Sequence, residues 1–250
     1  MLTYEYDGKF FNYIEAGSKR SAAVVASLML EALPIRSVLD VGCGRGAWMA
    51  EWMRRDVQEV DGVDGFYVDA NHLEVPRERF HARDISQPFR LSRSYDLVTC
   101  LEVAEHIDTG AADTLIDNLT SHGQLVLFSA APPGQGGEYH VNERPYGYWR
   151  DKFASRGFHL FDFLRPRLLH QRNVEPWYRY NTLLFAHEDR TKYLPPEILA
   201  TAITPSAPVV DLAPLTWRIR KQMLRLVPRA SQIKLAKIKH ALVRVVRRTA

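Results

Sequence analysis

The sequence predicts an α/β protein built on a doubly wound, mostly parallel sheet, followed by a basic helical C-terminal tail. Three observations support this prediction. Apolar, strand-like runs alternate with helix-like stretches, a glycine-rich turn follows the first strand-like run, and the chain has 250 residues. Such alternation favours a parallel sheet with helices on both faces, and this length suits one such domain with an appendage.

Short β-rich runs bounded by turn residues predict the strands of the sheet. They are residues 37–41, 57–63, 95–100, 124–129, 158–163 and 182–186. Apolar residues at helical spacing predict helices at 18–32, 47–55, 111–119 and 145–156, the last opened by Pro145. Ligands of such sheets bind beyond the carboxyl ends of the strands, so we expect function in the turns that follow them.

Composition excludes several classes of protein. The chain is 46% hydrophobic and 25% charged, as soluble globular domains are. Its two cysteines, Cys43 and Cys100, lie in apolar runs, which argues against a disulfide scaffold and a cysteine-rich zinc site. Residues 1–11 lack the pattern of a signal peptide, and the longest apolar stretch, 22–33, is too short to span a membrane. We therefore expect a cytoplasmic protein.

Charge and proline divide the chain into three parts. Residues 212–250 hold 11 Lys and Arg and no acidic residue. Residues 1–211 therefore hold 22 basic and 29 acidic residues, a net charge of −7. Five prolines between residues 194 and 214 deny a continuous helix or central strand. We expect a catalytic domain at 1–190, a proline-rich linker at 191–214 and a basic amphipathic tail at 215–250.

The tail has the pattern of a basic amphipathic helix, with apolar residues at helical spacing beside lysines and arginines. Such helices lie on anionic bilayers, which would hold the protein peripherally at the inner face of the cell membrane. They also bind nucleic acid. Alternatively, the tail folds onto the acidic body or onto a second subunit of a homodimer.

The glycine-rich turn is the first motif that points to a ligand. Residues 38–48 read VLDVGCGRGAW, a strand followed by three glycines and a helix. Glycines allow close approach of the backbone to a ligand, but a turn of this kind also occurs in NAD-binding domains. The complete motif resembles the first motif of class I S-adenosylmethionine (SAM)-dependent methyltransferases. The resemblance covers residues 35–187 and implies a Rossmann-like methyltransferase fold with seven strands and SAM as cofactor.

The resemblance also implies a cofactor site made by residues at strand ends and turns. These are Asp40, Gly42, Gly44, Asp64, Asp84, Ile85 and Leu101. Asp64 would bind both ribose hydroxyls, because a carboxylate can accept two hydrogen bonds from a diol. Asp84 would accept from the adenine amino group while the amide of Ile85 binds the ring. Taken alone, Asp84 could equally cap a turn.

A second motif, EVAEH at residues 102–106, follows the fourth predicted strand. Its carboxylates and imidazole are ligands for a divalent cation, with Mg²⁺ or Mn²⁺ favoured. His140 lies in the loop after the fifth strand, at the same edge of the sheet. The pattern resembles the metal-dependent small-RNA 3′-terminal 2′-O-methyltransferases and, in part, the ubiquinone-biosynthesis O-methyltransferases. This resemblance implies Glu102, Glu105, His106 and His140 as metal ligands.

Two mechanisms are open at this site. A bound divalent ion would lower the pKa of an acceptor hydroxyl. Without a metal, His140 or His106 would act as the catalytic general base, since imidazole titrates near neutral pH.

The loop after the fifth strand also suggests an acceptor. Residues 134–158 resemble a stretch of bacterial methyltransferases from polysaccharide and glycan gene clusters, which implies a sugar. Tyr139, Asn142, Trp177 and Tyr178 could stack on a sugar ring or bind its hydroxyls. For Trp177 and Tyr178, packing in the core is an equal alternative.

The sequence therefore predicts a SAM-dependent O-methyltransferase, assisted by a divalent metal, that methylates a sugar hydroxyl of a glycan or glycoconjugate. Three alternatives stay open. They are an RNA ribose 2′-O-methyltransferase whose tail binds phosphates, a methyltransferase of small quinone- or catechol-like molecules, and a SAM-binding adaptor.

Overall fold

The computed structural model describes residues 8–227, with side chains from residue 16 onward. Its strands are β1 (Ser37–Val41), β2 (Glu59–Asp64), β3 (Phe80–Ala82), β4 (Leu97–Leu101), β5 (Leu125–Ser129), β6 (Phe158–Phe161), β7 (Leu183–His187) and β8 (Ala202–Ile203). Its α-helices are α1 (Gly8–Ala32), α2 (Ala47–Arg54), α3 (Ala112–Thr120), α4 (Tyr146–Ala154), α5 (Arg165–Leu168), α6 (Pro176–Asn181), α7 (Glu188–Thr191), α8 (Pro196–Leu199) and α9 (Leu215–Arg225).

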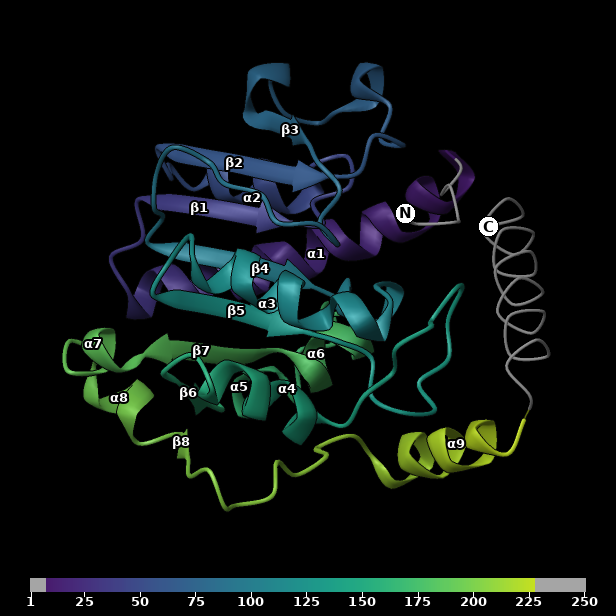
Figure 1. Ribbon diagram of the computed structural model, residues 1–250. Coiled ribbons are helices and arrows are strands. Elements are labelled where there is room, and N and C mark those ends of the chain that lie inside the picture. Colours follow the sequence, from purple (N-terminus) through teal and green to yellow (C-terminus); the bar gives the residue numbers. More distant parts are fainter. Residues whose placement is uncertain (1–7, 228–250) are drawn as a thin grey trace.

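The strands form one twisted sheet in the order β3-β2-β1-β4-β5-β7-β6-β8 (Figure 1). The first five strands in this order are parallel, and β7 is antiparallel to both of its neighbours. The parallel strands therefore bring the turns that follow β1, β2, β4 and β5 to one edge of the sheet, which is where ligands of doubly wound sheets bind.

The predicted fold class is confirmed, and each of the six predicted strands has its counterpart in the sheet. The number of strands is corrected from seven to eight. Strands β3 and β8 were not predicted, because three and two residues are too few to show a period. Residues 176–181, for which no element was predicted, form the short helix α6, with Pro176 in its first turn.

Helices cover both faces of the sheet and enclose two apolar cores. One face packs against α1 and α2, with Trp52 and Met29 fully buried. The other packs against α3 and α4, which lie in front of the sheet in Figure 1. There the rings of Phe153 and Phe185 stack at a centroid distance of 4.0 Å, and Phe128 meets Phe153 edge-on at 5.4 Å. These aromatic contacts fix α4 against the centre of the sheet.

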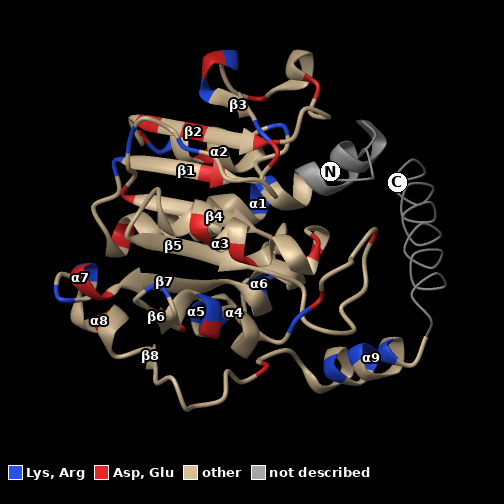
Figure 2. Ribbon diagram, viewed as in Figure 1, with Lys and Arg blue, Asp and Glu red and all other residues tan. Residues whose placement is uncertain are grey.

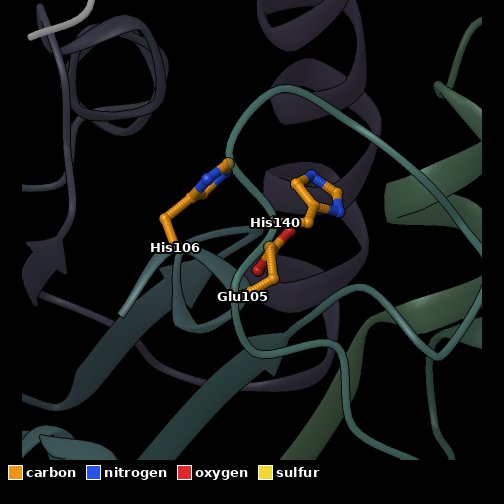
Figure 3. Close-up of side chains that lie close together, drawn as sticks. All are labelled: Glu105, His106 and His140. Carbon is orange, nitrogen blue, oxygen red and sulfur yellow. The ribbon is translucent and has the colours of Figure 1, made fainter. Parts of the chain in front are cut away.

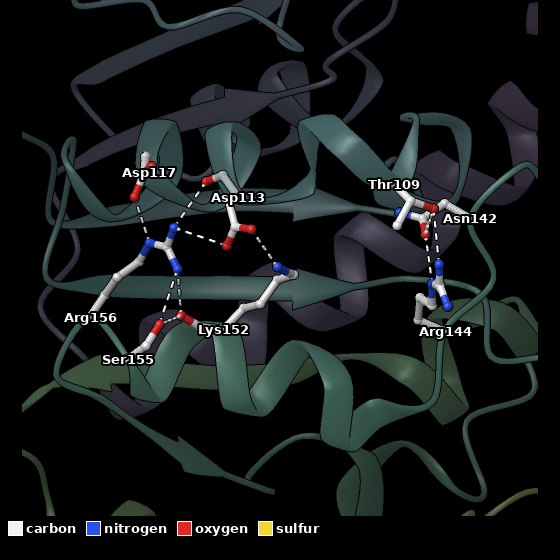
Figure 4. A network of polar contacts seen from close by, with 8 residues as sticks. All are labelled: Thr109, Asp113, Asp117, Asn142, Arg144, Lys152, Ser155 and Arg156. Carbon is white, nitrogen blue, oxygen red and sulfur yellow. Dashed lines mark hydrogen bonds and ion pairs between the residues drawn. The ribbon is translucent and has the colours of Figure 1, made fainter.

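Ion pairs join α3 to α4 along their solvent side (Figure 4). Lys152 Nζ lies 2.7 Å from Asp113, and Arg156 Nε lies 2.6 Å from Asp117. Because both aspartates are exposed, these pairs orient the two helices and add little stability.

Residues 191–214 are not a free linker, contrary to the prediction from their prolines. Ile198 of α8 is fully buried in the core, and β8 pairs with β6. The guanidinium of Arg165 donates to the carbonyl of Val210 at 2.9 Å, and that of Arg150 to Ala207 at 2.6 Å. The prolines exclude long helices and strands, but residues 191–214 still pack along the sheet; we call this segment the strap. In the predicted tail, α9 is helical, and residues 231–248 lie outside the described residues.

Candidate active site at the carboxyl edge of the sheet

The turn after β1 is built to bring backbone close to its neighbours. Gly42 has a φ of +82°, and a Cβ there would lie 2.4 Å from a methyl of Val103. Gly44 also has a positive φ, and its N–H donates to the Asp64 carboxylate at 2.6 Å. Glycine is needed at both positions, since a side chain would clash at the first and be strained at the second.

Asp64, at the end of β2, is buried beside this turn. Its carboxylate accepts from Gly44 and, at 2.7 Å, from the N–H of Gly65, and the hydroxyl of Tyr67 also donates to it. Burial raises the pKa of Asp64, and these donors oppose the rise. The structure thus places Asp64 against the glycine turn, and its contact with a ribose remains a prediction.

Asp40 is buried one strand away, below the same turn. The hydroxyl of Thr99 on β4 donates to its carboxylate at 2.6 Å. Burial raises the pKa of Asp40 to about 7, the bond from Thr99 lowers it, and the nearby charge of Asp64 adds to the rise. Two carboxyls therefore face the glycine turn from adjacent strands.

The turn after β3 holds the two residues predicted to bind adenine. The Asp84 carboxylate accepts from the N–H and hydroxyl of Ser86, at 3.0 and 2.6 Å, so it does cap a turn. Ile85 is buried, and its carbonyl accepts from Asn118 on α3 at 3.2 Å. Leu101 is buried at the end of β4. The cap is compatible with a second partner on the free carboxylate lone pairs.

Glu102 does not join the other predicted metal ligands. It has a φ of +56°, and its carboxylate accepts from Gln135 at 2.7 Å and from Asn181 of α6 at 3.0 Å. Burial raises its pKa, while these amides oppose the rise. Glu102 therefore lies outside the group of residues that come together, and its role as a metal ligand stays a prediction.

The remaining three predicted ligands do come together (Figure 3). Glu105, His106 and His140 each offer one ligand atom, and these atoms lie within 4.8 Å of one another. Glu105 is 0% exposed, and neither carboxylate oxygen has a hydrogen-bond donor. Burial and the neighbouring Glu102 raise the pKa of Glu105 well above its usual value. A buried carboxyl without donors costs free energy that a cation would offset.

Both imidazoles are oriented by a partner on Nδ1. His106 Nδ1 donates to the carbonyl of Tyr139 at 3.3 Å, and His140 Nδ1 donates to Glu143 at 2.9 Å. In a neutral ring that donates from Nδ1, Nε2 is the nitrogen that can bind a metal. Burial lowers the pKa of His106 to about 3, which keeps it neutral. Held in this tautomer, a histidine is prepared to bind a metal, and the partner on its other nitrogen fixes the ring.

Glu143 is a site residue that the sequence analysis missed. Its carboxylate accepts from His140 and from the N–H groups of Gly134 and Gly136, both at 2.7 Å. Burial opposes its ionisation, but these donors together lower its pKa. The signal was present as a histidine followed three residues later by a glutamate. A virtual Cβ on Gly137 would lie 2.1 Å from His140, so a glycine there makes room for the ring.

Of the four predicted substrate residues, Tyr139 lies at the cluster. Its φ is +56°, a strained value that turns its carbonyl toward His106 and places His140 next in the chain. Asn142 is buried, and its amide accepts from Thr109 and Arg144, each at 2.9 Å (Figure 4). These contacts give Asn142 a structural role and do not support the prediction that it binds a sugar.

Trp177 and Tyr178 belong to α6 and pack in the core. Tyr178 is buried, its hydroxyl lies 3.2 Å from that of Ser18, and its ring meets Trp48 edge-on at 5.0 Å. Trp177 packs beside it on the same core. The packing alternative is therefore the one that the structure supports for Tyr178.

Comparison with known sequences agrees with this geometry. Residues 13–172 match a family model described as a methyltransferase domain. A ubiquinone biosynthesis O-methyltransferase of Alkalilimnicola ehrlichii is 35% identical over 105 residues, which cover 38% of this chain and 41% of the relative. The ribosomal RNA large subunit methyltransferase G of Aeromonas hydrophila is 29% identical over 132 residues, 48% of this chain and 33% of the relative. The chain thus spans less than half the length of both relatives.

Solved structures share the fold at low identity. CalS10, an amino pentose methyltransferase from Micromonospora echinaspora, aligns with a TM-score of 0.52 and 17% identity over 74% of this chain and 98% of its own. The magnesium protoporphyrin IX methyltransferase of Synechocystis aligns with a TM-score of 0.50 and 20% identity over 75% of this chain and 91% of its own. Since the family model covers more than half of the chain and the fold agrees with it, the chain belongs to the methyltransferase-domain family.

Proposed function

We propose that this methyltransferase is an O-methyltransferase, assisted by a divalent metal ion, and that its acceptor is a sugar hydroxyl of a glycan or glycoconjugate. The observation that carries the proposal is the cluster of Glu105, His106 and His140 at the same sheet edge as the glycine turn and Asp64. A hydroxyl is a poor nucleophile at neutral pH, so a site for O-methylation needs a group that takes up its proton.

The residues of the cluster fit a metal. Glu105 is buried with no donor on its carboxylate, and Nδ1 of each imidazole donates to an oxygen, which orients both rings at the cluster. One carboxylate and two imidazoles are donors that suit Mn²⁺ better than Mg²⁺, which prefers oxygen alone. When bound there, the ion would lower the pKa of the acceptor hydroxyl and hold adjacent oxygens in place.

The protein's own groups divide the remaining work. In the alternative mechanism without a metal, His140, whose Nδ1 donates to Glu143, would accept the proton of the hydroxyl at its Nε2. Burial lowers the pKa of His106 to about 3, so His106 is a weak base. Gln135 and Asn181 hold the Glu102 carboxylate beside Glu105. Transfer then needs the methyl group in line with the hydroxyl oxygen, so positioning supplies much of the rate.

A sugar acceptor is proposed on chemical grounds. Adjacent hydroxyls of a sugar offer two oxygens to one cation, which orients the ring and selects one hydroxyl. Tyr139 lies partly exposed at the cluster and could stack on the sugar ring. RNA with a terminal ribose diol and a catechol share this chelating chemistry, and they are the competing acceptors that an assay must include.

The proposal is tested by calorimetric titration of S-adenosylhomocysteine, followed by Mn²⁺ or Mg²⁺, into three proteins. They are the wild type, the double variant Glu105→Gln/His140→Ala and the control His159→Ala, whose imidazole is exposed on β6. We expect all three to bind S-adenosylhomocysteine with dissociation constants within about twofold, and the double variant alone to lose metal binding. Equal metal binding by the double variant would refute the site.

Acceptor class is tested by methyl transfer from radiolabelled SAM in the presence of Mn²⁺. The acceptors are a pyranose with adjacent hydroxyls, its deoxy analogue, a short RNA and a catechol. Transfer to the pyranose and not to the deoxy analogue supports the proposal. Transfer to RNA or catechol alone would contradict the sugar assignment and leave the metal site standing.

A further inference from the structure

Helix α9 carries a stripe of apolar side chains that face solvent. Leu215, Ile219 and Met223 of α9 and its C-cap residue Leu226 recur at intervals of four, four and three residues, so they lie along one face of the helix. Their exposed fractions are 68%, 46%, 65% and 87%. Nothing in the described part of the chain covers this stripe, and a row of large apolar side chains marks a contact surface.

The opposite face of α9 is fixed to the loop that follows β5. Arg220 donates to the carbonyl of Gln135 at 3.0 Å, and Arg225 donates to that of Pro133 at 2.9 Å. Lys221 is buried and pairs with Asp211. A Cβ on Gly134 would lie only 2.1 Å from the Lys221 carbonyl, so helix and loop touch at the backbone. The helix therefore turns its apolar stripe outward while it is held from behind.

Charge decides which partner suits this face. Arg218 and Arg225 are exposed on α9, and Figure 2 shows basic residues and no acidic residue on the helix. Residues 212–250 as a whole contain 11 Lys and Arg without one Asp or Glu. An anionic bilayer offers both a negative surface and an apolar interior to such a helix. RNA offers the charge alone and would leave the stripe in water.

We propose that α9 lies on an anionic membrane with Leu215, Ile219, Met223 and Leu226 buried at the level of the headgroups. No described helix is long and apolar enough to cross a bilayer, so this contact is peripheral. Because α9 is hydrogen-bonded to the loop of Pro133 to Gln135, docking would bring that loop to the membrane surface. The same loop contributes Gln135, whose amide donates to the Glu102 carboxylate. The docking itself does not depend on the proposed acceptor or metal.

The test is co-sedimentation of the full chain with vesicles of phosphatidylglycerol and phosphatidylcholine. The stripe variant is Ile219→Glu/Met223→Glu, and the matched control is Leu199→Glu, an exposed leucine of α8 at the other end of the strap. We expect the wild type and control to bind the anionic vesicles alike and the stripe variant to bind at least about tenfold more weakly. Phosphatidylcholine vesicles should bind none of the three strongly.

Two outcomes would overturn the proposal. One is equal binding of the stripe variant and the wild type, which would mean that cations outside α9 carry the interaction without the stripe. The other is the absence of vesicle binding by the wild type, including the case in which it binds a short RNA with steep salt dependence. Circular dichroism and binding of S-adenosylhomocysteine confirm that each variant is folded, and neither readout depends on the membrane.

Discussion

Asp40 yields a prediction about stability that is independent of the acceptor and the metal. Burial raises its pKa from the ordinary 3.8 to about 7, against the hydrogen bond from Thr99. Between these two values the folded protein holds a proton that the unfolded chain has released. The contribution of Asp40 to stability must therefore fall as the pH rises from about 4 to about 7, by about 1.4 kcal/mol for each pH unit and about 4 kcal/mol in total.

The variant Asp40→Asn removes this dependence. Asparagine has the same size and keeps an acceptor for the Thr99 hydroxyl, but it cannot ionise. Between pH 5 and pH 8 the wild type should lose about 3 kcal/mol of unfolding free energy relative to the variant. The assay is urea denaturation of the protein in EDTA, without cofactor, at both pH values. The exposed Asp108→Asn is the control, and it should differ from wild type by the same amount at each pH.

A constant difference between Asp40→Asn and wild type at pH 5 and pH 8 would refute the reasoning. It would mean that the folded protein carries Asp40 ionised over this whole range. The glycine turn would then face a negative charge below it at every pH in which the enzyme works.

Three further predictions concern the cofactor site, the core and the loop of the cluster. Asp64→Ala should lower the affinity for S-adenosylhomocysteine, measured by calorimetry, at least about tenfold, since charged hydrogen bonds to the ribose are lost. An unchanged affinity would exclude the ribose role of Asp64. Phe153→Ala should cost about 3 to 5 kcal/mol in urea unfolding, because its ring is fully buried between two others, and a loss below about 1 kcal/mol would contradict that packing. Asn142→Ala should lower the free energy of unfolding by about 1 to 3 kcal/mol, because buried hydrogen bonds are lost, and should leave the KM for the acceptor unchanged. A raised KM in a protein of unchanged stability would instead support the prediction that Asn142 binds the substrate.

The sequence predicted those parts of the molecule whose information is local. The strand before the glycine turn has the bounds that its apolar run indicates, and Asp64 ends the next strand as expected. Strand β3 and strand β8 were missed because they exist only through pairing with β2 and β6, which no short window shows. Helix α8 was missed for the same reason, because its Ile198 is buried in the core that residues of α1 and α2 form, far from it in the sequence.

The candidate site was predicted in part for the same reason. Glu105, His106 and His140 meet because parallel strands share an edge, which the pattern of elements indicates. Glu102 departs because its backbone has a positive φ and its partner Asn181 lies 79 residues further along the chain. The spacing of residues within the EVAEH motif could not anticipate either fact.

The pairing of β8 with β6 sets where this chain can be shortened. Strand β6 is apolar, and without β8 its outer backbone groups would be open to any other strand. A fragment ended at residue 190 would retain the strands from β3 to β6 in the sheet and yet expose that edge, together with the core surface that Ile198 covers. Such a fragment would pair with its own copies and aggregate, so expression of the catalytic domain requires a boundary beyond residue 214.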